Sequence, residues 1–216
     1  MARSRPSITV IGKGTSSSYP EKSRVTLIIS ASGPSQGVAE GTFNQLTADL
    51  RRLLELSSSP QEAPGIAHYF IAPIPDFSEV RPSNGDITTY HYQTEARIIF
   101  RDIYEMKLVL PELIHPPDVY LLCIEWFIGP STMSMIGARA RQMAMEDAGC
   151  KAEEYANHAF GEEFLLMRIK EIRSTCEHPQ NKPRLAKRHP RYAPSSLTPV
   201  KFVYTVVLKA KYRAMA

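Results

Sequence analysis

The sequence predicts an α+β fold, a two-layer domain in which about three helices pack on a mostly antiparallel sheet. Three observations predict it: segments with alternating apolar residues dominate the chain, helices with one apolar stripe are inserted among them, and no internal repeat occurs. The expected order of elements is β-β-α-β-β-α-β-α-β-β. We expect a single domain over residues 1–216, with a flexible, basic, proline-rich insertion at about 173–198.

The N-terminal part of the chain predicts two strands and a helix. In SITVIG and SRVTLIISA, apolar residues recur at every second position, as in half-buried strands. Gly12-Lys13-Gly14 and the serines after it indicate a hairpin-like connection between these strands. The helix expected over 38–56 has apolar residues spaced four-three-four-three, at Ala39, Phe43, Leu46, Leu50 and Leu53. That stripe is typical of a core-facing helix and is too short for a coiled coil.

The middle of the chain contains the clearest strand, at residues 90–100. Its apolar face would carry Tyr90, Tyr92, Thr94, Ala96, Ile98 and Phe100, and such alternation favours an antiparallel sheet with one solvated face. Residues 76–86 before it are expected to form a polar loop. Asp102 can cap a following helix, in which Pro111 is expected to cause a kink or a break. Residues 119–128 are apolar on both faces until Glu125, which suits a central strand whose solvated end begins there.

A long helix is predicted from Ser131 to about Gly161, followed by strands at 163–172 and 200–212. Its apolar stripe is made of small residues, so the helix can lie close to a sheet, with Tyr155 filling the wider end. Asp147 and Lys151 are four residues apart with the acid first, an order that stabilises a helix by a few tenths of a kcal/mol. The simplest interpretation is that this pair only stabilises the helix, and a functional charge pair is the alternative.

The order of residues in this helix resembles the SIMPL-domain (DUF541) family. The motif residues are Ala144, Asp147, Ala148, Lys151, Ala152, Tyr155 and Ala156, and the opening segment ITVIGKGTSSSYPEKSRVTLIISASG also resembles the family's first strands. The resemblance implies a non-catalytic protein. The family includes an animal adaptor in inflammatory signalling, and bacterial envelope proteins linked to stress tolerance, some of which form rings. We do not expect the N-terminal segment to be a secretory signal, so the chain is expected to resemble an intracellular eukaryotic member more than an envelope protein.

One basic segment accounts for the positive charge of the chain. The segment contributes +5 to a formal charge of +4, so the rest of the chain carries −1; its cations are Lys182, Arg184, Lys187, Arg188 and Arg191. A nearly neutral body disfavours a nucleic-acid footprint over the whole surface. The segment itself is a candidate nuclear-import signal, RNA or phosphate contact, or docking patch for an acidic partner, and a solvated disordered loop is the simplest alternative.

No motif in the sequence indicates catalysis, a cofactor or a metal. There is no HExxH, phosphate loop or GxSxG, and Cys176, His178 and His189 lack a fourth ligand at the usual spacing. Three cysteines without a CxxC pair suit a reducing compartment, and no segment is apolar enough to cross a membrane. We therefore expect a cytoplasmic protein, with a nuclear location also open. Its expected function is a non-enzymatic interaction or adaptor domain that can form homo-oligomers, and a nucleic-acid or phosphate binder acting through residues 182–191 is the alternative.

Overall fold

The computed structural model describes residues 6–56, 66–81, 88–159, 164–177 and 198–214. They form two compact units. The three-stranded unit is built from the described residues of 1–19, 128–179 and 200–216, and the five-stranded unit from those of 20–127 and 180–199. The predicted α+β class is confirmed, and the elements follow the predicted order with one addition. Strand β4 (Asp76–Val80) lies in the segment that was expected to be a polar loop.

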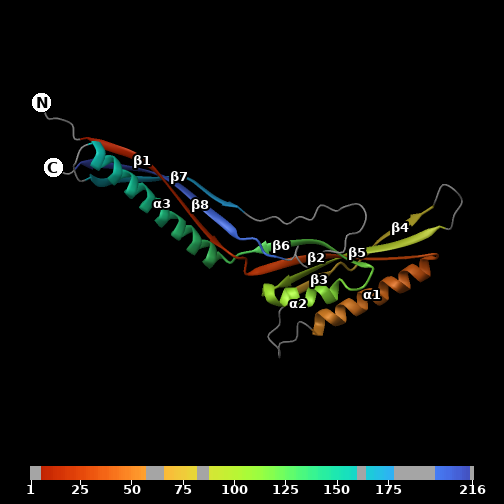
Figure 1. Ribbon diagram of the computed structural model, residues 1–216. Helices are drawn as coiled ribbons and strands as arrows, with labels where there is room; N and C mark the ends of the chain where they lie inside the picture. Colours follow the sequence, from red (N-terminus) through yellow and green to blue (C-terminus); the bar gives the residue numbers. More distant parts are fainter. Residues whose placement is uncertain (1–5, 57–65, 82–87, 160–163, 178–197, 215–216) are drawn as a thin grey trace. The chain divides into compact units, whose positions relative to one another are not determined.

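The three-stranded unit is an antiparallel sheet with one helix on one face. Strands β1 (Ser7–Ser18), β8 (Phe202–Ala214) and β7 (Phe164–Glu177) lie in the order β1-β8-β7, and helix α3 (Pro130–Ala159) runs along the sheet (Figure 1). Alanine, valine and leucine side chains meet in the core between helix and sheet: Val10, Ala140, Ala144, Ala148, Ala152, Val206, Leu208 and Ala210. Because alanine side chains are small, the backbone of α3 lies close to the strands. This short distance lets side chains of α3 reach the backbone of β1.

Two expectations for this unit are wrong. The Gly12-Lys13-Gly14 segment is not a connection, because β1 continues through it and pairs with β8 over its whole length. Glycine inside a strand often marks a close approach of another backbone rather than a turn, and that is its role here. The insertion expected at about 173–198 begins later, because β7 continues to Glu177. The remainder of that insertion is outside the described residues, except for 198.

The five-stranded unit is an antiparallel sheet with two helices on one face. The main path of strands is β3 (Ile66–Ile71), β5 (Thr89–Phe100), β2 (Lys22–Gly33) and β6 (Val119–Phe127), and β4 also pairs with β5 (Figure 1). Helices α1 (Gln36–Leu56) and α2 (Ile103–Leu113) cover the face formed by buried apolar residues of β2 and β5. These residues include Val25, Leu27, Ile29, Ala96, Ile98 and Phe100. The alternation predicted for 90–100 is therefore confirmed.

Two details of this unit differ from the expectations. Strand β6 is at the end of the main strand path and not at its centre. Pro111 lies in the last turn of α2, and the helix continues through it to Leu113 without a break. The start of α2 is as predicted: the side chain of Asp102 accepts a hydrogen bond of 2.8 Å from the backbone N–H of Tyr104.

Candidate interaction surfaces

The contact between α3 and β1 leaves no space for a side chain on the strand. A Cβ atom placed on Gly12 would lie 2.0 Å from the backbone oxygen of Ala144, and one on Gly14 would lie 2.0 Å from that of Ala140. Both alanines are completely buried. The expectation that a stripe of small residues lets this helix lie close to the sheet is confirmed, and the two glycines supply the matching space on the strand.

Asp147 and Lys151 connect α3 to the backbone of β1. The backbone N–H of Lys13 donates a hydrogen bond of 2.8 Å to Oδ2 of Asp147. Lys151 Nζ donates to the same oxygen at 2.6 Å and to the backbone oxygen of Ile11 at 3.1 Å. Strand β1 is at the end of the sheet, so these are groups of its outer edge. The pair therefore satisfies one donor and one acceptor of this strand edge, in addition to stabilising the helix.

The electrostatics of this contact favour the ionised carboxylate. The hydrogen bond from Lys151, followed by that from the backbone of Lys13, lowers the pKa of Asp147 below the ordinary value of 3.8. Asp147 thus stays ionised beside Lys151 at neutral pH. A helix pair with such backbone contacts has a fixed geometry that a freely solvated surface pair lacks.

The other motif residues divide into buried and exposed positions. Ala144, Ala148, Ala152 and Ala156 are buried, as expected for the stripe. Tyr155 is 58% exposed, so the expectation that it fills the wider end of the stripe is wrong. The rings of Tyr204 and Tyr212 pack against this stripe instead, and a Cβ on Gly137 would approach the ring of Tyr204 to 3.5 Å. Tyr155 is therefore available on the surface of α3.

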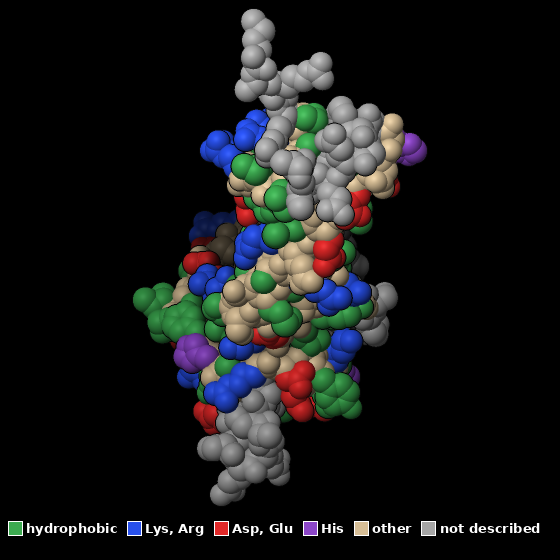
Figure 2. Space-filling view, turned by 90° about the vertical axis from the view of Figure 1, so that its left-hand side faces the viewer, with side chains coloured by type: hydrophobic (Ala, Val, Ile, Leu, Met, Phe, Trp, Pro, Cys, Tyr) green, Lys and Arg blue, Asp and Glu red, His purple; other side chains and the backbone are tan. Residues whose placement is uncertain are grey.

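Strand β7 has an open outer edge. It ends the order β1-β8-β7, and no described strand pairs with its outer side. Its exposed apolar side chains are Leu165 (55%), Leu166 (42%), Met167 (53%), Ile169 (38%) and Ile172 (53%). On the face drawn in Figure 2, hydrophobic side chains lie among charged ones. A 14-residue strand whose outer edge pairs with no described strand, and which carries exposed apolar residues, is a template for pairing with another chain.

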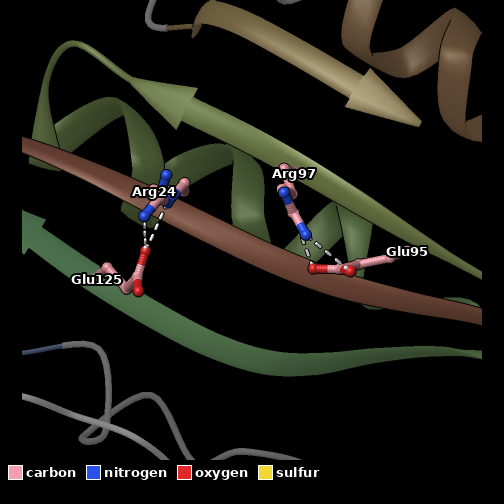
Figure 3. Close-up of polar contacts among 4 residues, drawn as sticks. All are labelled: Arg24, Glu95, Arg97 and Glu125. Carbon is pink, nitrogen blue, oxygen red and sulfur yellow. Dashed lines mark hydrogen bonds and ion pairs between the residues drawn. The ribbon is translucent and has the colours of Figure 1, made fainter. Parts of the chain in front are cut away.

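On the side away from α1 and α2, no described helix covers the five-stranded sheet. Two ion pairs lie on it: Arg24 of β2 binds Glu125 of β6, and Arg97 Nε lies 3.0 Å from Oε1 of Glu95 on β5 (Figure 3). The guanidinium of Arg24 also lies 5.3 Å from the centre of the Phe127 ring. Glu125, which was expected to begin a solvated strand end, has a side chain that is 42% exposed and paired with Arg24.

Charged and aromatic side chains share this face of the five-stranded sheet. The hydrogen bond to Glu95 raises the pKa of Arg97 above its ordinary value. Phe127 is 40% exposed and Phe70 50% exposed. The pairing of Phe70 with Arg97 places it on the same side of the sheet. The face is thus amphipathic, with its charges largely neutralised in pairs.

Little in the described residues points to bound ligands. They contain no group of three or more His, Cys, Asp and Glu side chains that could hold a metal. A cleft of about 270 Å³ beside α1 is lined by Glu40, Phe43, Arg51 and Tyr92 among others, without a nucleophile paired to a base. None of the described helices combines the length and the apolar character needed to span a bilayer. The cations at 182–191 lie outside the described residues, as do His178 and His189, and Cys176 is half-buried in β7.

Comparison with known sequences agrees with the resemblance inferred from the motif. The sequence model of the SIMPL family, described as a protein of unknown function (DUF541), matches residues 8–212. The match covers nearly the whole chain, and it includes both units described above. No curated protein matches the chain. The chain belongs to the SIMPL (DUF541) family.

Proposed function

We propose that this chain is a non-enzymatic protein-interaction domain that self-associates by adding a second copy at the free edge of β7. The observation that carries the proposal is the outer edge of this strand, with which no described strand pairs, and the five exposed large apolar residues along it. Strand addition uses main-chain hydrogen bonds for affinity and alternate side chains for specificity. A second copy is the simplest partner with a matching apolar strand, because each copy presents the same edge.

The two edges of the three-stranded sheet are not equivalent. On β1, the carboxylate of Asp147 and the ammonium of Lys151 occupy backbone groups of Lys13 and Ile11. A partner strand would have to displace these contacts. Strand β7 has no such cover from the described residues. The asymmetry favours β7 as the edge that receives a partner.

Strand β7 also has features that restrict which strand can pair with it. The register with β8 shifts at Met167 and again at Ile172, and basic residues separate the apolar ones. Bulges and charges on an edge reduce indiscriminate pairing. They therefore support selective addition of one partner rather than open-ended aggregation.

The proposed setting follows from the family resemblance and the sequence. We place the protein inside the cell, as an adaptor in signalling or in the stress response. The free thiols of Cys123, Cys150 and Cys176 are compatible with a reducing compartment. Binding of nucleic acid or phosphate by residues 182–191 remains the alternative function, and truncation of that segment separates it from strand addition.

Size-exclusion chromatography with light scattering tests self-association. We expect the wild-type protein to elute as an oligomer at micromolar concentration. The double variant Leu165→Glu/Ile172→Glu should elute as a monomer, because it places charges on the proposed interface. The matched control, Val38→Glu/Leu108→Glu, changes residues of similar exposure (52% and 53%) on the helices α1 and α2. It should retain the wild-type mass.

Two outcomes would contradict the proposal. A wild-type monomer at micromolar concentration removes self-association. An oligomer that survives in the β7 variant but is lost in the control places the interface in the five-stranded unit. Circular dichroism of both variants separates loss of association from loss of folding.

A further inference from the structure

The face of the three-stranded sheet opposite α3 carries a ladder of basic residues. Because Val206, Leu208 and Ala210 of β8 are buried under α3, the residues between and beyond them point to the other face. The strand registers arrange that face in four successive rows across β1, β8 and β7: Ser7–Arg213–Leu165, Thr9–Lys211–Arg168, Ile11–Lys209–Lys170 and Lys13–Val207–Arg173. We name this surface the cationic face.

The bulges of β7 help to gather the charge. Simple alternation would place Arg173 on the opposite face from Arg168 and Lys170. The shift of register at Ile172 brings all three to the same face. Glu171, which is paired with Leu208, lies on the α3 side instead. The cationic face thus contains seven basic residues, all exposed, and no acid in its four rows.

The arrangement is unfavourable for the protein alone. Arg168 lies directly opposite Lys211, and Lys170 directly opposite Lys209. Like charges opposite each other destabilise a sheet. Within the described part of the chain, no ion pair connects these residues to an acid. A bound polyanion would relieve this repulsion. A purely structural role for the face does not explain why like charges lie opposite each other.

We propose that the cationic face binds the phosphate backbone of a nucleic-acid duplex. Lys and Arg are the main phosphate contacts of such proteins, and the hydroxyls of Ser7 and Thr9 beside them can donate to phosphate oxygens. The four rows contain no aromatic side chain, so they offer no stacking platform for unpaired bases. The rows extend over roughly 20 Å. A duplex presents about 12 phosphates over that length.

This inference goes beyond the proposed function and does not depend on it. A second copy at β7 would extend the sheet and leave the cationic face open. The near-neutral body disfavours a nucleic-acid footprint over the whole surface, and the proposed footprint is confined to one sheet face. The net charge of the chain does not reveal the cationic face, because acids elsewhere in the same unit offset its charge. Examples on α3 are Glu146, Glu153 and Glu154.

Fluorescence anisotropy with a labelled mixed-sequence duplex, as DNA and as RNA, tests the inference. The variant Arg168→Gln/Lys170→Gln/Lys209→Gln/Lys211→Gln removes four charges from the face. Its control, Arg51→Gln/Arg52→Gln/Arg101→Gln/Lys107→Gln, removes four exposed charges from the five-stranded unit. A third variant replaces the five cations of 182–191 with serine. Three further probes are tested for binding in the same way: one labelled strand of the duplex alone, polyglutamate, and vesicles of anionic lipid.

We expect the wild type to bind the duplex with a steep salt dependence. If four phosphates are contacted, Kd should rise about 150-fold between 50 and 200 mM salt. The variant of the cationic face should bind at least about tenfold more weakly with a shallower salt slope, while the control stays within about twofold of wild type. Equal losses in the variant and the control would overturn the inference. So would a loss confined to the 182–191 variant, or binding of vesicles or polyglutamate without binding of the duplex.

Discussion

Gly12 shows how a single hydrogen atom determines the packing of the three-stranded unit. The backbone oxygen of Ala144 occupies the place that a Cβ on Gly12 would take. Neither of the two backbones can move away without opening the layer between α3 and β1. A glycine in a strand normally weakens it, and here the close helix contact offsets that cost.

Gly12→Ala should therefore destabilise the three-stranded unit by about 3 kcal/mol or more, the upper range for overpacking a core. Gly149→Ala is the matched control, because no atom lies within 4 Å of the added Cβ. The control should stabilise α3 by about 0.5–1 kcal/mol, since alanine is the better helix former. Urea unfolding followed by circular dichroism measures both. A Gly12→Ala protein as stable as wild type would show that the close backbone contact is absent in solution.

Asp147 gives the same contact a dependence on pH. Its pKa is lowered in the folded protein by Lys151 and Lys13, so the folded state holds the proton less tightly than the unfolded state. This contribution to stability is complete above the unfolded value of about 3.8, and it is lost as the pH falls through the folded pKa. Asp147→Asn should thus be less stable than wild type at pH 7.

The difference in stability between wild type and Asp147→Asn should shrink as the pH falls below 3.8. Glu146→Gln is the control, since Glu146 is a neighbouring exposed acid of α3 that bonds only to Gln142 on the same helix. Urea unfolding at several pH values should give parallel curves for this control and the wild type. An Asp147→Asn deficit that is constant down to pH 2 would mean that the lost interaction does not involve the charge.

At the scale of elements, the sequence predicts best where one face of a strand or helix is buried. Strand β5 and the alanine stripe of α3 were predictable because apolar residues at a regular period imply one buried face. Asp102 was predictable as a cap because its chemistry is local. These signals require no knowledge of the neighbouring elements.

Other elements depend on partners that the local sequence does not show. Gly12-Lys13-Gly14 carries the same local signal as a turn, and the pairing with β8 and the close contact with α3 explain why it is a strand. Strand β6 has an apolar second face although it ends the main strand path. The bulges of β7 break the period of two, so neither the face of Arg173 nor the cationic face could be derived from alternation.

At the scale of the whole molecule, averages conceal the candidate sites. A formal charge of +4 on 216 residues gives no sign that seven basic residues share one sheet face. The expected single domain over 1–216 likewise does not distinguish the two compact units, each with its own sheet and core. The chain passes between these units after Tyr19 and again after Phe127. A substitution that disturbs one unit alone can test whether the two units unfold cooperatively.

Hydrogen exchange of the Gly12→Ala protein addresses that cooperativity. Because regions of a protein open with their own free energies, a disturbance of the contact between α3 and β1 should act within one unit. Amides of α3 and β8 should exchange faster than in wild type, while those of β2 and β5 keep their wild-type protection. Mass spectrometry of peptides from each unit measures the two responses separately. Equal acceleration in β2 and β5 would instead show that both units form one cooperative domain, as the sequence first suggested.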